Sequence, residues 1–218
     1  MFGLPDITAL LVRLPPLFFA LTIHEFAHGY VAYLCGDATA KVNGRLTLNP
    51  LAHLDPVGTL CILFAPIGWA RPVPVNPANF RHPRRDDILV SLAGVGANLA
   101  TAVAAAVLLR LALLAGLRPA AAGDTVAVLW VMVETLCLIS IGLMIFNLIP
   151  VPPLDGSHVL RELLPRNAAM AYAQMAPYAP LILIALVFTG VLSVILGPPL
   201  FFLVRVLLGN ALIFPFPF

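Results

Sequence analysis

Two histidines and a glutamate stand close together in an apolar segment near the start of the chain. His24, Glu25 and His28 occur in the run LTIHEFAH. Residues four apart share one face of a helix, at a separation that lets two imidazoles bind one zinc ion. Glu25 lies beside them, where it can act as general base on a zinc-bound water. A carboxylate in mid-membrane costs roughly 2.5–3.5 kcal/mol on insertion scales, so this run favours a metal site over a chance match.

A third metal ligand must come from elsewhere in the chain, because a catalytic zinc usually has three protein ligands. The extended motif of soluble zinc proteases is excluded, since Val31 and Leu34 stand where it needs a glycine and a histidine. No glutamate follows Glu25 before Glu134. The remaining candidates are three aspartates: Asp37, Asp55 and Asp155.

Asp155 is the favoured third ligand, with Asp55 as the alternative. It lies in the run IPVPPLDG, whose three prolines forbid regular helix and whose Gly156 permits close backbone approach. Unwound backbone at membrane depth is tolerated only where it lines a cavity or is buried in protein. The charges also balance, because the single negative charges of Asp155 and Glu25 together offset Zn²⁺, which limits the cost of burial.

The composition is that of a membrane protein. Of the 218 residues, 61% are hydrophobic and only 10% are charged, whereas a soluble domain has roughly 25% charged residues. The net charge of +2 and the single lysine, Lys41, exclude nucleic-acid binding. Cys35, Cys61 and Cys137 lack metal or disulfide spacing and are interpreted as apolar fillers. We expect one all-α polytopic domain over residues 1–218, with its first segment retained because no signal-peptide pattern precedes it.

The apolar pattern predicts about four transmembrane helices, at residues 7–34, 88–115, 126–149 and 177–208. The last is interrupted by the run GPP at 197–199, which leaves five spans as the alternative. Residues 57–69 are too few to span and are predicted to form a re-entrant or interfacial element. Residues 41–48, with a hairpin-like Asn43-Gly44, and residues 71–75 are expected to be short β-like segments that could hold an unwound substrate by edge pairing.

Basic residues predict the orientation, since positive charge collects on the cytoplasmic side. Only Arg118 lies in the loop between the second and third spans. The other loops therefore face the cytoplasm, with the N-terminus outside. Their basic residues are Lys41, Arg45, Arg71, Arg81, Arg84, Arg85, Arg161 and Arg166.

Taken together, these features resemble the site-2 protease family of intramembrane zinc metalloproteases, over nearly the whole chain. The resemblance is carried by HEFAH at 24–28, by residues 147–156, and by GVGAN at 94–98. It implies that His24, His28 and Asp155 bind Zn²⁺ and that Glu25 is the catalytic acid/base. Many relatives have a proline where this chain has Val95, and no stretch is long and polar enough for a PDZ domain, as in the compact subgroup.

The resemblance also assigns supporting residues. It places Asn147 near the site, where it helps to hold substrate, and it associates Gly94 and Asn98 with packing near the substrate path. From the residues alone, Asn98 and Asn147 are amides that could equally form interhelical hydrogen bonds. The remaining histidines are interpreted without a catalytic role: His53 and His158 as interfacial or capping residues, and His82 as a solvated loop residue.

The predicted function is hydrolysis of peptide bonds in or near the transmembrane segments of membrane-protein substrates. The predicted location is the plasma membrane of a prokaryote. Substrate identity and oligomeric state stay open. A transporter is the first rival, and no inverted repeat relates the two halves of the chain. A scaffold with a structural zinc is the second, and such a site has no need of Glu25.

Overall fold

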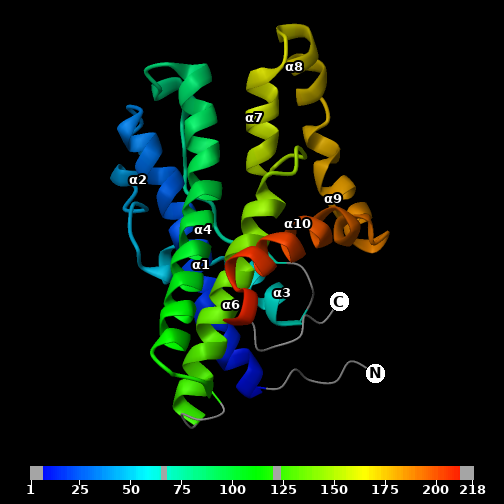
Figure 1. The fold of residues 1–218 in the computed structure, drawn as a ribbon. Helices are drawn as coiled ribbons and strands as arrows, with labels where there is room; N and C mark the ends of the chain where they lie inside the picture. Colours follow the sequence, from blue (N-terminus) through cyan, green and yellow to red (C-terminus); the bar gives the residue numbers. More distant parts are fainter. Residues whose placement is uncertain (1–6, 65–67, 120–123, 212–218) are drawn as a thin grey trace.

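The chain folds as an assembly of helices, in which three long ones form the central bundle (Figure 1). The computed structural model describes residues 7–64, 68–119 and 124–211. Single turns of 3-10 helix occupy Pro50–Ala52, Pro77–Asn79, Ala176–Tyr178 and Gly209–Ala211. The α-helices are α1 (Ile7–Leu34), α2 (Thr39–Val42), α3 (Pro56–Phe64), α4 (Pro83–Leu114), α6 (Asp124–Asn147), α7 (Asp155–Leu163), α8 (Arg166–Ala173), α9 (Ala179–Phe188) and α10 (Val191–Leu207).

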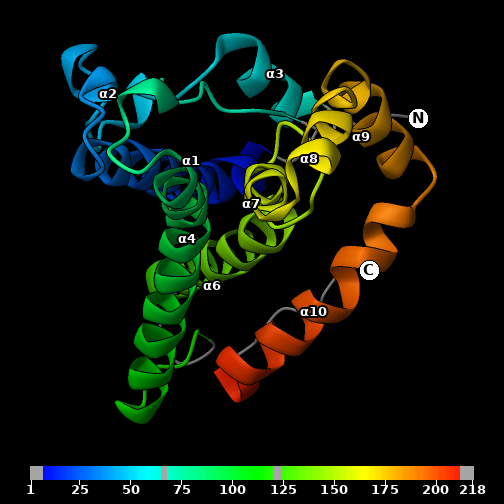
Figure 2. The ribbon, with the colours of Figure 1, turned by 90° about the horizontal axis from the view of Figure 1, so that it is seen from above.

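Helices α1, α4 and α6 pack against one another, and α7 continues beyond α6 along the other half of α4 (Figures 1 and 2). At 1.5 Å per residue, the 32 residues of α4 extend about 48 Å, so one helix contacts both partners. Small buried residues, Ala102, Ala105 and Ala106, permit close approach on the side of α4 that belongs to the main core. Cys137 of α6 is fully buried there, with its Sγ 3.4 Å from the carbonyl oxygen of Ala102, in agreement with its interpretation as a filler.

Within the residues that the structure describes, four helical segments are long and apolar enough to cross a membrane, as the sequence predicts. The first three are Leu10–Leu34, Pro83–Leu114 and Thr125–Asn147, close to the predicted bounds. The fourth is Arg166–Phe188, built from α8, α9 and the turn between them.

The last predicted span, 177–208, is wrong as a single helix. The chain breaks at Gly190, whose φ of +72° lies in the left-handed region that favours glycine. The expected interruption at 197–199 is absent, because α10 runs through Pro198 and Pro199. Prolines are tolerated inside apolar membrane helices, where local adjustments satisfy the freed carbonyl groups. After the break, α10 returns to pack on α6.

The region predicted as a re-entrant or interfacial element contains α3, which has nine residues and is too short to span. Its membrane position stays a prediction. The expected β-like segments are not formed: the described residues contain one isolated antiparallel bridge, between Leu54 and Ala70. Asn43 and Gly44 end the short helix α2 instead of making a hairpin. Asp37 favours this outcome, because its side chain accepts a hydrogen bond from the N–H of Thr39, at the start of α2.

Residues 71–82, here called the strap, connect the α3 region to α4 and lie over α1. Three backbone hydrogen bonds fasten it: Arg71 N–H to His53 O (2.8 Å), Asn76 N–H to Asp37 Oδ2 (2.7 Å) and Arg81 N–H to Cys35 O (3.0 Å). Burial would raise the pKa of Asp37, but hydrogen bonds from Asn76, Thr39 and Asn79 outweigh this and lower the pKa. The carboxylate of Asp37 is therefore ionised and accepts several hydrogen bonds. It anchors the strap beside the helix that carries both histidines of HEFAH.

Candidate metal centre

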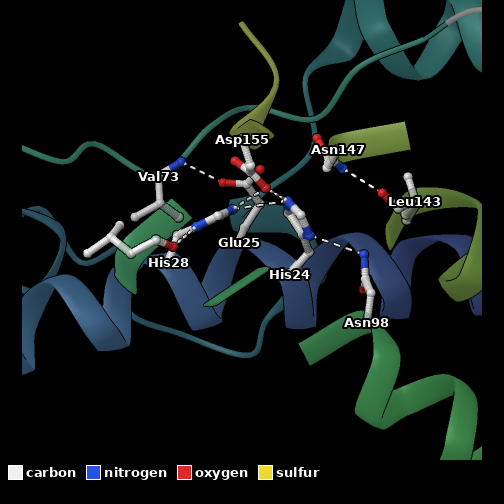
Figure 3. Close-up of polar contacts among 9 residues, drawn as sticks. His24, Glu25, His28, Val73, Asn98, Leu143, Asn147 and Asp155 are labelled. Carbon is white, nitrogen blue, oxygen red and sulfur yellow. Dashed lines mark hydrogen bonds and ion pairs between the residues drawn. The ribbon is translucent and has the colours of Figure 1, made fainter. Parts of the chain in front are cut away.

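The imidazoles of His24 and His28 and the carboxylate of Asp155 converge at one point (Figure 3). The two histidine Nε2 atoms are 3.0 Å apart, and each lies 3.3 Å from Asp155 Oδ2. Helix α1 supplies the histidines through their four-residue spacing, and α7 supplies Asp155 as its first residue. Among the described residues, these three side chains form the group of histidines and acids that lie close enough together to hold a metal ion.

The three atoms have the spacing that a zinc ion requires. Zinc bound tetrahedrally at about 2.0–2.1 Å places neighbouring ligand atoms about 3.3 Å apart. The measured separations of 3.0, 3.3 and 3.3 Å match that edge. Burial would raise the pKa of Asp155, but hydrogen bonds and charge from the two histidines lower it to about 2. The carboxylate is therefore ionised at neutral pH, which is the form that binds a metal.

The second nitrogen of each imidazole is held from α4. His28 Nδ1 lies 2.7 Å from the carbonyl oxygen of Val90, which can only accept, so Nδ1 carries the proton and the Nε2 lone pair is free. His24 Nδ1 lies 3.0 Å from the side-chain amide of Asn98, which is fully buried. A metal on Nε2 would leave the proton on Nδ1, and the Asn98 amide, turned over, would accept it through Oδ1, which has no partner among the described residues. Both contacts orient Nε2 toward Asp155 (Figure 3).

Gly94 lets α4 approach these imidazoles. A methyl group built on Gly94 would lie 2.6 and 2.7 Å from Cε1 and Nδ1 of His24, and closer still to Nε2 of His28. Such contacts are shorter than van der Waals separation, so any side chain at this position displaces the ligands. The resemblance associates Gly94 with packing near the substrate path, and the structure places it against both imidazoles.

The proline-rich turn between α6 and α7 positions Asp155. The predicted close backbone approach at Gly156 is confirmed: a Cβ there would lie 2.6 Å from the carbonyl carbon of Leu148 and 2.9 Å from the carbonyl oxygen of Ile149. Further along α7, Arg161 donates to Asp87 of α4 at 2.9 Å, which fastens α7 to α4. Both contacts fix how α7 presents its first residue to the histidines.

Glu25 projects to the same place and is held by the strap. The backbone N–H of Val73 donates to Glu25 Oε2 at 2.8 Å (Figure 3). Val73 is buried and packs over Gly29, where an added Cβ would lie 3.0 Å from Val73 Cγ1. The glycine that follows HEFAH therefore makes room for the residue that orients Glu25.

These groups line a cavity of about 320 Å³. Asn147, at the last turn of α6, belongs to its wall and donates from Nδ2 to Leu143 O at 2.9 Å. The other lining residues are His24, Glu25, His28, Pro72, Val73, Val75, Pro77, Asp87, Val90, Ser91, Pro153, Asp155 and His158.

The other two aspartate candidates have different partners. Asp55 accepts a hydrogen bond from Gly58 N–H at 2.7 Å, in the first turn of α3, and Asp37 anchors the strap. Sequence reasoning missed the contributions of Val73 and Val90, since main-chain contacts leave no side-chain pattern to read. It also missed Asp87, although an acid directly before a predicted span was a signal that could have been used.

Fold and site together define a membrane-embedded metalloprotease, and comparison with known proteins agrees. Residues 14–190 match the peptidase family M50, so the chain belongs to this family of site-2-type zinc metalloproteases. YwhC of Bacillus subtilis, provisionally named a zinc metalloprotease, is 42% identical over 188 residues, covering 84% of this chain and 83% of YwhC.

A second set of relatives is more distant. Rip2 of Mycolicibacterium smegmatis, also provisionally named a zinc metalloprotease, is 32% identical over 179 residues, which are 80% of this chain and 65% of Rip2. Rip2 of Mycobacterium tuberculosis strain H37Rv is 32% identical over 174 residues, which are 77% of this chain and 62% of that protein. No solved structure shows a significant match. The protein is thus an integral membrane zinc metalloprotease of family M50.

Proposed function

We propose that this protein hydrolyses peptide bonds in or near the transmembrane helices of membrane-protein substrates, with Glu25 as general base. The observation that carries the proposal is that His24, Glu25 and His28 lie on a helix long enough to span a bilayer. The carboxylate of Asp155, at the start of α7, meets them beside a cavity. His24, His28 and Asp155 would hold the zinc that the family uses. Bound zinc supplies Lewis-acid chemistry, which brings the pKa of a water to roughly 7 and polarises a carbonyl group.

Glu25 moves the proton in this scheme. Its Oε2 accepts the Val73 N–H, which holds the carboxylate on the cavity wall. Glu25 accepts a proton from the attacking water and then delivers it to the nitrogen of the leaving amine. Asn147 lies in the same wall and offers its amide to the substrate backbone.

The strap offers a surface for an unwound substrate. In the run PVPV at 72–75, only the two valines have a backbone N–H. The N–H of Val73 donates a hydrogen bond to Glu25. The N–H of Val75 and the C=O of Val73 have no hydrogen-bond partner among the described residues. Both valines line the cavity. An extended substrate segment lying there could pair with these groups, as in strand addition.

The orientation of the cavity follows from charge. Helices α2, α7 and α8 and the start of α4 lie at one end of the molecule, and the end of α4 and the start of α6 lie at the other (Figure 1). The first end carries most of the basic residues, and the second carries fewer, Arg13, Arg110 and Arg118. We infer that the basic end faces the cytoplasm of a prokaryotic cell, so water reaches the cavity from that side.

Replacing Glu25 by Gln tests the role of the general base. The amide cannot accept the proton, so cleavage of a transmembrane reporter by the purified protein should fall at least about 100-fold. Zinc content should stay at the wild-type level, because Glu25 is not a ligand. Glu162→Gln, the same change on α7 outside the cavity, is the control. Cleavage by Glu25→Gln at the wild-type rate would contradict the proposal.

A further inference from the structure

A second polar cluster borders the cavity and takes no part in the proton transfer proposed for Glu25. Asp87 of α4 and His158 of α7 both belong to the cavity wall. The side chain of Asp87 is 7% exposed, and its Oδ2 lies 2.9 Å from an Arg161 guanidinium nitrogen and 3.6 Å from His158 Nδ1. A buried carboxylate is costly unless it is paired, and Arg161 alone would supply the counter-charge. The proximity of a histidine to the same oxygen therefore calls for a separate explanation.

The geometry of α7 directs this histidine to the cavity. Asp155, His158 and Arg161 follow one another at intervals of three residues. Each therefore lies on the same side of α7 as the next. The Asp87–Arg161 ion pair fixes the rotation of α7 about its axis. The same constraint that presents Asp155 to the metal site therefore presents His158 to the cavity that the substrate must enter.

Asp87 decides which ring nitrogen is available. Because Nδ1 is the atom nearest to Asp87, Nε2 remains, and it has no partner among the described residues. The side chain of His158 is 43% exposed, whereas that of Asp87 is nearly covered. In the imidazolium form both nitrogens donate, one toward Asp87 and the other toward a ligand in the cavity. The charged groups that face it are Asp87 and Arg161, with Glu25 and Asp155 in the same cavity wall.

Peptide hydrolysis needs such a donor. The carbonyl oxygen of the scissile bond gains negative charge as water adds, and a donor placed in advance stabilises that charge. Glu25 is occupied with proton transfer, and one N–H of Asn147 is already given to Leu143 O. We propose that His158 is a catalytic residue that donates a hydrogen bond from Nε2 to this oxygen, and that Asp87 is the positioning residue that orients it. This inference rests on the proposed function.

The kinetics of His158 variants test the inference. His158→Ala should lower kcat about 100-fold, with KM changed far less, because the bond strengthens as charge develops. His158→Gln keeps a neutral N–H donor of similar reach and should recover about tenfold of that loss. Both variants should keep wild-type zinc content, since His158 is not a ligand. His82→Ala is the matched control, since the side chain of His82 is exposed and does not cap α4.

Asp87→Asn gives a readout that a purely structural role would not move. The neutral amide orients His158 less firmly toward the substrate oxygen, so kcat should fall while KM changes far less. A kcat of His158→Ala within about twofold of wild type overturns the inference and leaves the proposed function intact. Loss of zinc from His158→Ala also overturns it, in favour of a structural role. A wild-type protein that binds zinc and cleaves no reporter overturns both.

Discussion

Three of the four candidate spans pack tightly around the metal site, and the fourth hardly packs at all. Within their apolar windows, 22%, 39% and 33% of the residues of the first three spans are buried, against 6% for Arg166–Phe188. Figure 2 shows α4 and α6 side by side, with α9 set apart from them and α10 returning toward them. Buried polar ligands demand fixed geometry from the helices that carry them, whereas a lipid-facing helix needs only to be apolar.

The same contrast appears in the glycines. Gly29, Gly94 and Gly156 lie at contacts where a side chain would collide with a neighbour. Gly190 and Gly197, in the C-terminal part, have open space around them. Among these five glycines, the close contacts therefore lie at the site and the open surroundings lie in the C-terminal part. The comparison predicts that small changes near α1 and α4 impair activity strongly and that larger changes in α9 do not.

The largest effect is expected from Gly94→Ala. Its methyl group would collide with both imidazoles, so zinc binding should weaken and cleavage should fall at least about 100-fold, with overpacking costing about 1–3 kcal/mol of stability. Gly96→Ala is the matched control on the same helix, because its methyl group would meet nothing within 4 Å. Zinc content and cleavage of both variants check this. Equal activity of the two would show that the packing of α4 does not hold the ligands.

A smaller effect is expected from Gly29→Ala, which acts on Glu25 through the strap. The methyl group would push Val73 by a few tenths of an ångström, shift its N–H from Glu25 and lower kcat about tenfold, with zinc retained. Adding Val73→Ala removes the Cγ1 atom in the way, so the double variant should recover part of the loss. Strictly additive effects of the two changes on kcat would contradict the proposed contact.

The smallest effect is expected in the fourth span. Phe188 is 82% exposed, so Phe188→Ala should change the free energy of unfolding by less than about 0.5 kcal/mol and leave cleavage unchanged. Ile141 of α6 is fully buried, and Ile141→Ala should cost about 2–5 kcal/mol. Unfolding in mixed micelles measures both. Similar losses would mean that the C-terminal helices are packed as firmly as the bundle.

The parts of this molecule that could be predicted are those in which side-chain type reports on position. His24 and His28 stood out because polar rings at helical spacing are costly in an apolar segment. Asp155 stood out because the prolines before it exclude regular helix there and Gly156 permits close backbone approach. Fold class and span count followed from apolar length alone. Each of these signals is local in the sequence.

The rest depends on contacts that leave no local signal. The bond from Val73 to Glu25 and the acceptor of His28 at Val90 are main-chain groups, which every residue has. Prolines 198 and 199 suggested a break that membrane helices tolerate, whereas Gly190 made the actual one. His158 gave no sequence signal that separated it from a capping residue, because its partner Asp87 is 71 residues away.

The most direct test of the account measures the zinc coordination of the purified protein by X-ray absorption, together with zinc content of two aspartate variants. The account predicts about one zinc per chain, with nitrogen and oxygen neighbours at about 2.0–2.1 Å. It predicts that Asp155→Ala loses the metal or the oxygen neighbour and that Asp55→Ala keeps both. A sulfur neighbour at about 2.3 Å, or unchanged coordination in Asp155→Ala, would contradict the convergence of α1 and α7 on one metal.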